Sequence, residues 1–329
     1  MPSLNTASTS HQPISHRQIS DNFTLAKFLA IVLVSTGHYF HDTLIWVPVT
    51  VGLFIFGFSS GYFTALKHQN GQSLKGFWLA KLKRLGPPLI VINLFLGALF
   101  LIEGRAGLWH PHTLLGITGM SGLLNWFGIP NQSPYGAGLW FMTVLLLFYL
   151  VYPFLAKSLK SSTAALVFIV ISGLVCTLGH LYASPPYMLW PTVFGFCLGA
   201  AAGSINWQPS AKYSLVAGTI TVVTALGLNA IGIKQFNMLA VVTLSIASTA
   251  FLLGFPLKIA VSRISLLSGS ILEIYLIHSY LFIRPSAWPE WTGYLASMML
   301  VLIVSVILHS MAQLLNGRLM VSKAPIPVN

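Results

Sequence analysis

Long apolar runs return along the whole chain, separated by short stretches of polar residues, glycine and proline. A helix needs about 20 apolar residues to cross the roughly 30 Å hydrocarbon core of a bilayer. The pattern therefore predicts an all-α integral membrane protein, a bundle of about ten transmembrane helices. The predicted spans are residues 23–40, 46–66, 86–103, 137–156, 163–182, 187–204, 213–232, 236–255, 266–284 and 293–314.

Composition restricts the class of protein further. Of the 329 residues, 55% are hydrophobic and only 7% are charged, and the mean hydropathy is +0.80. A soluble domain usually carries about 25% charged residues, so soluble, disordered and disulfide-scaffold proteins are excluded. Cys176 and Cys197 lie inside apolar runs, where buried reduced thiols are expected.

The distribution of lysine and arginine predicts the orientation in the membrane. Of 17 basic residues, all but Arg105, Lys234 and Arg284 fall on the face that would carry both termini. The positive-inside rule makes that face cytoplasmic, and anionic lipid then explains the net charge of +12 without a nucleic acid partner. We expect a disordered cytosolic tail over 1–20, a transmembrane domain over 21–316 and a cytosolic C-terminal tail over 317–329.

The two longest connections differ in character. Residues 67–85 are polar and basic, which predicts a cytosolic loop, whereas residues 104–136 fall on the outer face. The outer stretch is too apolar for a solvated loop and too rich in glycine and proline for a span. It is interpreted as an interfacial or re-entrant segment over the outer mouth of the bundle, tolerated because it packs on protein.

Ionisable residues inside spans are candidates for function, because such groups are costly in lipid and usually face a bundle interior. Lys27 and His38 lie eleven positions apart, which places them on one helix face, separated by about 16 Å of rise. Asp42 follows His38 at i+4, within reach of its imidazole. This arrangement suits an anionic cofactor that enters from the cytosol and reaches a general base. Taken singly, Lys27 fits a snorkelling lysine and His38 fits an interfacial histidine bonded to a carbonyl.

The segment KLKRLGPP (81–88) forms a second cationic group. It places Lys81 and Arg84 on one face at the cytosolic mouth of the third span, with Lys83 beside them. Guanidinium and ammonium groups together suit a phosphate clamp. Ordinary positive-inside retention is the alternative explanation.

The ninth predicted span holds Glu273 and His278. Glu273 is the only carboxylate deep in a predicted span, so we expect it to be protonated or paired. A structural hydrogen bond between helices is the alternative. His278 is expected near the outer end of its span, at the level of His38.

Other signatures are absent from the sequence. The histidines form no HExxH pattern and no CxxC is present, so no metal is expected, and His110 and His112 are assigned to the outer segment. Without a Walker-type phosphate loop or a GxSxG elbow, a nucleotide-driven pump and a serine hydrolase are disfavoured. The glycine-rich pieces at 57–62 and 195–203 indicate close helix packing.

Five segments in order resemble the membrane-bound acyltransferase-3 family, the integral-membrane O-acyltransferases of bacterial envelopes, over about residues 20–314. They are KFLAIVLVSTGH (27–38), with a basic residue and a histidine separated by ten positions; the aromatic-rich FIFGFSSGYF (54–63); KLKRLGPP (81–88), with a basic pair before proline; GLWFMTVLLLFYLVYPFL (138–155); and LEIYLIH (272–278), with its YLxH ending. The chain departs from the family pattern at Lys27, usually arginine, at Leu145–Leu147, where many members carry a glutamate, and at Ile271-Leu272, where a Ser-Tyr pair is common.

The resemblance implies an acyl-CoA donor, most often acetyl-CoA, bound from the cytosol, and a hydroxyl acceptor on an envelope glycan or lipid-linked sugar. It places the protein in the cytoplasmic (inner) membrane. It also implies residue roles. The donor would be bound by Lys27, Lys81, Lys83 and Arg84. His38 would be the general base, with Asp42 holding its tautomer, or alternatively a transient acyl carrier. Glu273, His278 and Tyr149 would orient the imidazole or stabilise the thioester oxyanion.

Two classes without catalysis remain as alternatives. One is a transporter or flippase for a lipid-linked sugar, although the repeated halves common in transporters are not visible in the sequence. The other is a structural partner of glycan-assembly enzymes, and self-association also stays open. A chemical requirement for His38 separates the classes, because a permeation path tolerates neutral replacements that a general base does not.

Overall fold

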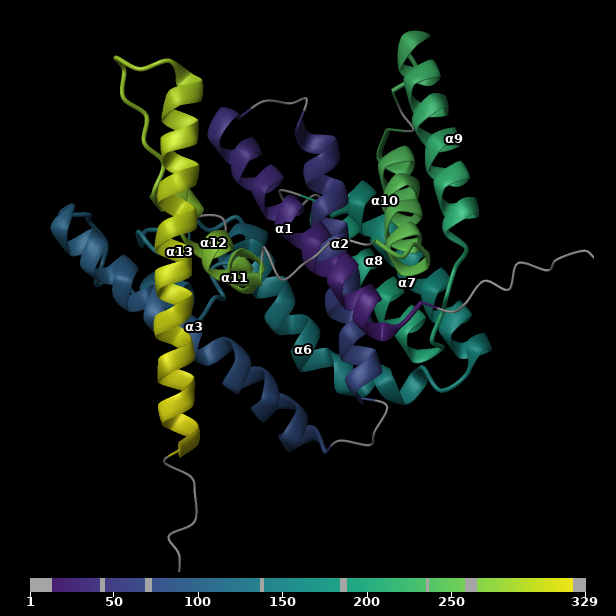
Figure 1. Ribbon diagram of the computed structural model, residues 1–329, viewed down its shortest axis with the longest axis horizontal. Coiled ribbons are helices and arrows are strands. Elements are labelled where there is room, and N and C mark those ends of the chain that lie inside the picture. Colours follow the sequence, from purple (N-terminus) through teal and green to yellow (C-terminus); the bar gives the residue numbers. More distant parts are fainter. Residues whose placement is uncertain are drawn as a thin grey trace, which may run out of the picture.

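The computed structural model describes residues 14–41, 45–68, 73–136, 139–183, 188–234, 237–257 and 265–321, and these ranges form helices and turns with no strand. Figure 1 shows a bundle of tilted helices, with α9 and α13 standing at opposite sides. The helices are α1 (His16–Phe40), α2 (Trp46–His68), α3 (Leu74–Ile102), α4 (His112–Ile117), α5 (Gly122–Trp126), α6 (Trp140–Ser158), α7 (Ser162–Tyr182), α8 (Leu189–Ser204), α9 (Ala211–Ala230), α10 (Asn237–Gly254), α11 (Ser265–Gly269), α12 (Ile271–Ile277) and α13 (Glu290–Val321).

Eight helices in the described part of the chain are long and apolar enough to cross a membrane, namely α1, α2, α3, α6, α7, α9, α10 and α13. The protein is thus a multi-pass helical membrane protein. The other two predicted spans take different forms. The sixth is α8, an apolar helix of 16 residues, and the ninth is divided among α11, α12 and the 3₁₀ turn His278–Tyr280.

The break in the ninth predicted span has a local cause. Gly269 ends α11 and Ser270 precedes α12, and both residue types weaken a helix interior. Irregular backbone at membrane depth needs protein around it rather than lipid. This condition is met, because α12 is buried from Glu273 to Ile277.

The ends of three helices can be compared with the predicted boundaries. α1 begins at His16, where Ser15 and Gln18 form a capping box, so residues 16–20 of the expected disordered tail are helical. α3 begins at Leu74, so residues 74–85 of the expected cytosolic loop are also helical. α13 continues to Val321, but its part that could cross a membrane is Glu290–Gly317, next to the predicted end of the transmembrane domain at 316.

The basic segment 81–88 belongs to α3, with Pro87 and Pro88 inside the helix rather than at its start. Proline lacks an N–H and cannot donate to the carbonyl four residues earlier. The carbonyls of Lys83 and Arg84 therefore lose their helical donors at the point where the basic side chains gather. Such breaks are tolerated in membrane helices when neighbouring groups take up the freed carbonyls.

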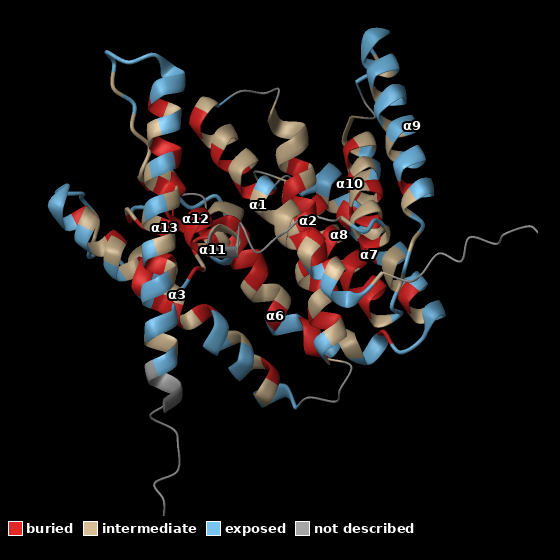
Figure 2. Cartoon of the chain, viewed as in Figure 1, coloured by how far each residue is buried: buried red, intermediate tan, exposed pale blue. Residues whose placement is uncertain are grey.

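Interlocking glycines hold α2 against α8 at the centre of the bundle. A Cβ atom on Gly61 would lie 2.2 Å from the carbonyl oxygen of Phe196, and one on Gly199 would lie 2.0 Å from that of Phe58. Small residues allow helix backbones to approach closely, which is how helices associate in lipid. Figure 2 shows the result: α2 and α8 are mostly buried, whereas α9 is mostly exposed. The glycine-rich pieces predicted to pack helices do so.

The outer segment between α3 and α6 packs on protein, as the sequence predicts. Its short helices α4 and α5 are tied to α6, since the Thr143 hydroxyl donates to the Gly119 carbonyl (2.8 Å) and accepts from the Gly122 amide (3.0 Å). The Tyr135 hydroxyl donates to the Asn93 carbonyl in α3 (2.8 Å). Trp109 and Phe127 remain largely exposed, as expected for aromatic residues at a membrane interface.

Candidate active site

An inner cavity of about 250 Å³ lies among α1, α2, α3, α6, the broken α11–α12 pair and α13. Its walls are largely apolar, but several polar side chains from separate helices converge on it. They are Lys27, Ser60, Arg84, Tyr149, Ser268, Glu273 and His309. A concave, mostly apolar site with a few converging polar groups is the usual form of a small-molecule site.

The charge in this cavity favours an anionic ligand. Among the residues that the structure describes, neither Lys27 nor Arg84 makes an ion pair. The carboxylate of Glu273 faces the same space, but one of its oxygens is already bonded to His309. Two cations without carboxylate partners attract a negatively charged group, and in a site of low dielectric that attraction is stronger than in water.

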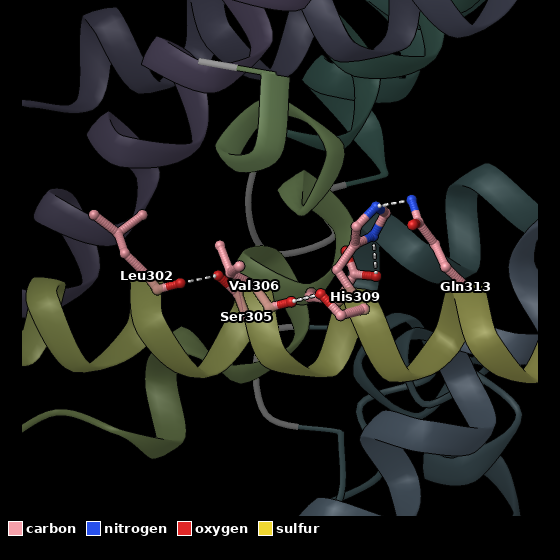
Figure 3. A network of polar contacts seen from close by, with 7 residues as sticks. Leu302, Ser305, Val306, His309 and Gln313 are labelled. Atoms are coloured by element: carbon pink, nitrogen blue, oxygen red, sulfur yellow. Dashed lines mark hydrogen bonds and ion pairs between the residues drawn. The ribbon is translucent and has the colours of Figure 1, made fainter. Parts of the chain in front are cut away.

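Glu273 and His309 belong to a polar network between α12 and α13, drawn in Figure 3. The Nδ1 atom of His309 lies 2.9 Å from Oε1 of Glu273, and its Nε2 atom lies 2.8 Å from the side-chain nitrogen of Gln313. Because the amide nitrogen of Gln313 can only donate, Nε2 accepts and Nδ1 carries the proton that is donated to Glu273. The network therefore fixes the carboxylate at the cavity wall.

The expectation that Glu273 would be paired is met, with His309 as the partner. Neither oxygen of Glu273 bonds to His38 or His278 within the described chain: Oε1 accepts from His309, and Oε2 has no hydrogen-bond partner. The geometry thus connects Glu273 with the inner cavity rather than with the imidazole of His38.

The basic residues of the 81–88 segment take three different positions. Arg84 lines the inner cavity. The Lys81 ammonium instead packs over the ring of Tyr149, 3.9 Å from its centroid, and donates to the Thr64 hydroxyl at 2.9 Å. Lys83 is exposed and lines a separate recess between α3 and α13. The Tyr149 ring itself lines the cavity, so Lys81 contributes to the cavity wall through its contact with this ring.

His38 and His278, which the sequence places at one level, come together in the structure. Their ring centroids are 5.2 Å apart. His278 is fully buried, and its Nδ1 atom donates to the Tyr275 carbonyl at 2.8 Å. Its Nε2 atom therefore accepts, and the Ser279 hydroxyl lies 3.2 Å from it. This places a neutral imidazole of fixed tautomer beside the half-buried ring of His38.

The histidine pair lies next to the inner cavity along two elements. On α1, Lys27, Ile31 and Val34 line the cavity, and His38 follows Val34 one turn later on the same face. On α12, Tyr275 lines the cavity and lies 6.1 Å from His278 between ring centroids. A long ligand that fills the cavity would have its end near the two imidazoles.

Arg284 fixes the end of α1 beside His38. Its Nη2 atom donates to the carbonyls of Tyr39 (2.6 Å) and His38 (3.3 Å) and to the ring of His41 (3.3 Å). A cation bonded to the last carbonyls of a helix stabilises its negative dipole end. Asp42, predicted to hold the tautomer of His38, lies outside the described residues.

The polar residues of this site that the sequence does not predict include His309 and Arg284, besides Ser60 and Ser268 of the cavity wall. His309 is a histidine inside an apolar span, which is the same signal that identified His38. Its neighbours Ser305 and Gln313 at i−4 and i+4 form a polar stripe on α13. For Arg284 the sequence gives only a cation after the YLxH segment, and no spacing rule connects it with α1.

The described residues contain no group of three or more histidine, cysteine, aspartate or glutamate side chains that could hold a metal. In the outer segment, the Nδ1 atoms of His110 and His112 both accept backbone N–H groups. Cys176 and Cys197 are free thiols in α7 and α8.

Comparison with known proteins adds one match. Residues 20–310 match the family described as an acyltransferase domain, acyltransferase-3. No curated protein and no solved structure matches the chain. The matched range covers α1 through most of α13 and so includes the inner cavity and both histidines. The chain belongs to the acyltransferase-3 family.

Proposed function

We propose that the protein transfers an acyl group, acetyl in the first instance, from cytosolic acyl-CoA to a hydroxyl of an envelope glycan or lipid-linked sugar in the bacterial cytoplasmic membrane. The observation that carries this proposal is the continuity of one face of α1, which leads from a cavity with two unpaired cations to a pair of histidines. Both termini would be cytoplasmic, because this orientation collects most of the basic residues on that side.

The cationic end of the cavity suits the phosphates of the donor. Arg84 offers a guanidinium fork and Lys27 an ammonium point charge, and both favour phosphate oxygens. Lys83 adds an exposed ammonium close by. Lys81 acts through Tyr149, whose ring it holds against the cavity.

His38 is proposed as the general base. Its ring takes the proton from the acceptor hydroxyl while the hydroxyl oxygen attacks the thioester carbonyl. The C–S bond then breaks, the acyl group remains on the acceptor oxygen, and the proton passes to the departing CoA thiolate. His278 packs against the ring of His38 and orients it, while Arg284 fixes the backbone beneath it. Asp42 remains proposed as the group that selects the tautomer of His38.

The proposal is tested by thiol release from acetyl-CoA in inside-out vesicles that contain the protein and native envelope lipids. We expect release above that of empty vesicles, and transfer of the labelled acyl group to material from the envelope. If the vesicles release no more thiol than empty ones while the protein still changes glycan export, the transporter function replaces the enzyme.

Replacing Arg84 by alanine is expected to raise the acetyl-CoA concentration needed for half-maximal rate. A hydrogen bond to a charged group contributes about 1.5–3 kcal/mol, which corresponds to roughly ten- to hundredfold in affinity. The maximal rate should change less, because the phosphates lie away from the reacting bond. The measurement is the rate of thiol release against acetyl-CoA concentration.

The matched control is Lys160→Ala, which removes an exposed cation after α6. It should leave the concentration dependence unchanged. An equal effect of both substitutions would show that Arg84 acts only through the general surface charge and would reject the phosphate clamp.

A further inference from the structure

A second recess, of about 410 Å³, opens between α3 and α13. α13 crosses α3 on this side of the bundle (Figure 1). The recess is lined by the part of α3 that carries the basic residues and by the C-terminal part of α13. Its lining residues are Ala80, Lys83, Arg84, Pro87, Pro88, His309, Ala312, Gln313 and Asn316. By the charge rule used above, both of these parts lie toward the cytosol.

The recess and the inner cavity share a wall. Arg84, Pro88 and His309 line both spaces. Their side chains therefore lie at the boundary between the recess and the cavity. Arg84 is exposed, and the His309 side chain retains 21% of its accessible surface. These three residues therefore line a passage between the recess and the cavity.

An unsatisfied hydrogen-bond acceptor, a carboxylate oxygen of Glu273, lies on the cavity side of this passage. Among the described residues, the buried Oε2 atom of Glu273 has no hydrogen-bond partner. The residue is only 1% exposed and lines the inner cavity. Leaving a buried polar group without a partner costs about 1–3 kcal/mol, and more for a charged group. The network through His309 and Gln313 holds the carboxylate in this position (Figure 3). A ligand that supplies an N–H or O–H donor would remove the cost.

The size of the two spaces limits how a donor can be placed. Sites for drug-sized ligands have volumes of roughly 300–1,000 Å³, and an acyl-CoA is larger than such a ligand. The inner cavity of about 250 Å³ has room for only part of it. The recess offers what the polar remainder needs, the ammonium of Lys83 and the side-chain amides of Gln313 and Asn316.

We infer that the acyl donor enters between α3 and α13. Its nucleotide stays in the recess beside Lys83, and its phosphates lie at Arg84, which lines both spaces, within the cationic end of the cavity that Lys27 completes. Its pantetheine arm then continues between Arg84 and His309 into the inner cavity. An amide N–H of the arm donates to Oε2 of Glu273, and the thioester then points along α1 toward His38. His309 is a positioning residue in this arrangement, since it acts through Glu273. This inference rests on the proposed function.

The test narrows the recess without changing the cavity. Ala80 is exposed and lines the recess, whereas its neighbour Leu79 is exposed and does not. We expect Ala80→Trp to raise the acetyl-CoA concentration for half-maximal thiol release by on the order of tenfold or more, because a displaced ligand is positioned poorly. The matched Leu79→Trp variant should behave like the unmodified protein. If both variants are active and need the same acetyl-CoA concentration for half-maximal thiol release, the proposed entrance is rejected. The acyl-CoA function would still stand.

A second measurement does not depend on turnover. Asn316→Cys places a thiol in the recess, and its labelling by a charged methanethiosulfonate reagent is followed with and without CoA. We expect CoA to slow the labelling and free pantetheine to slow it less, since the nucleotide occupies the recess. If CoA does not change the rate at which the thiol is labelled, the proposed entrance between α3 and α13 is rejected. Absence of thiol release by the unmodified protein is the separate result that rejects the acyl-CoA function.

Discussion

Replacing His38 by alanine is expected to abolish thiol release from acetyl-CoA while leaving the protein folded. A positioned general base contributes typically about 10²- to 10⁴-fold to a rate, which here would bring release to the background of empty vesicles. His38 is half-buried at the end of α1, and its ring contacts His278. Alanine keeps the helix, because it has the highest helix propensity. The measurement is the rate at saturating acetyl-CoA.

Two further variants separate chemistry from packing. His38→Gln keeps a polar side chain of similar size but cannot accept a proton at neutral pH, so it should be as inactive as alanine. His180→Ala removes an exposed histidine at the end of α7 and should be fully active. CoA should still protect the recess in the His38 variants, since its binding groups are intact. An active His38→Gln variant would remove the general base from the mechanism and favour a permeation path.

Most of the helical plan could be predicted from the sequence, because the length of an apolar run is set by the thickness of the bilayer. The span predicted at 46–66 is found as α2, and the one predicted at 163–182 as α7. The hydropathy pattern predicts helices least well where a helix is buried in protein and makes no contact with lipid. The run at 266–284 is predominantly apolar, yet the helix is broken at Gly269 and Ser270, where protein rather than lipid surrounds it.

The boundaries at the basic segment were mispredicted for a physical reason. Lysine, arginine and two consecutive prolines indicate a loop followed by a helix start. In the structure the helix continues through Pro87 and Pro88. Hydropathy and proline position do not predict the positions of the cationic side chains, because those positions depend on tertiary contacts. The Lys81 ammonium lies over Tyr149, a residue 68 positions later in the sequence, which no local pattern connects with it.

The sequence predicts the main residues of the candidate site, but not the contacts that connect them. Lys27 and His38 share a face because helical periodicity alone fixes their angle. The sequence also places His38 and His278 at one level of the membrane, but that their rings meet is seen only in the structure. The partner of Glu273 could not be predicted from the sequence, because His309 lies on another helix, 36 positions later in the sequence. His309 carried the same sequence signal as His38, but its role becomes visible only through its contact with Glu273.

The close approach of α2 and α8 leads to the largest expected effect on stability. Replacing Gly199 by valine should prevent the native packing of these helices. Even the first side-chain atom would lie 2.0 Å from the carbonyl oxygen of Phe58 and 2.9 Å from its Cα atom. Both are backbone atoms of a buried helix, so no rotamer change relieves the clash. Overpacking of a core typically costs about 1–3 kcal/mol, and a clash with backbone should lie at or above the upper end of this range.

The matched control is Gly227→Val in α9, where a Cβ atom would meet nothing within 4 Å. Both substitutions add the same atoms to a helical glycine, so differences in helix propensity cancel. The measurement is the amount of monodisperse protein recovered by size exclusion after detergent extraction and heating. Gly227→Val should match the unmodified protein, and Gly199→Val should be lost at lower temperature or fail to accumulate. Equal recovery of both variants would mean that α2 and α8 can separate without loss of the fold. The wall that α2 supplies to the inner cavity, at Leu53, Phe56 and Ser60, would then not depend on this contact.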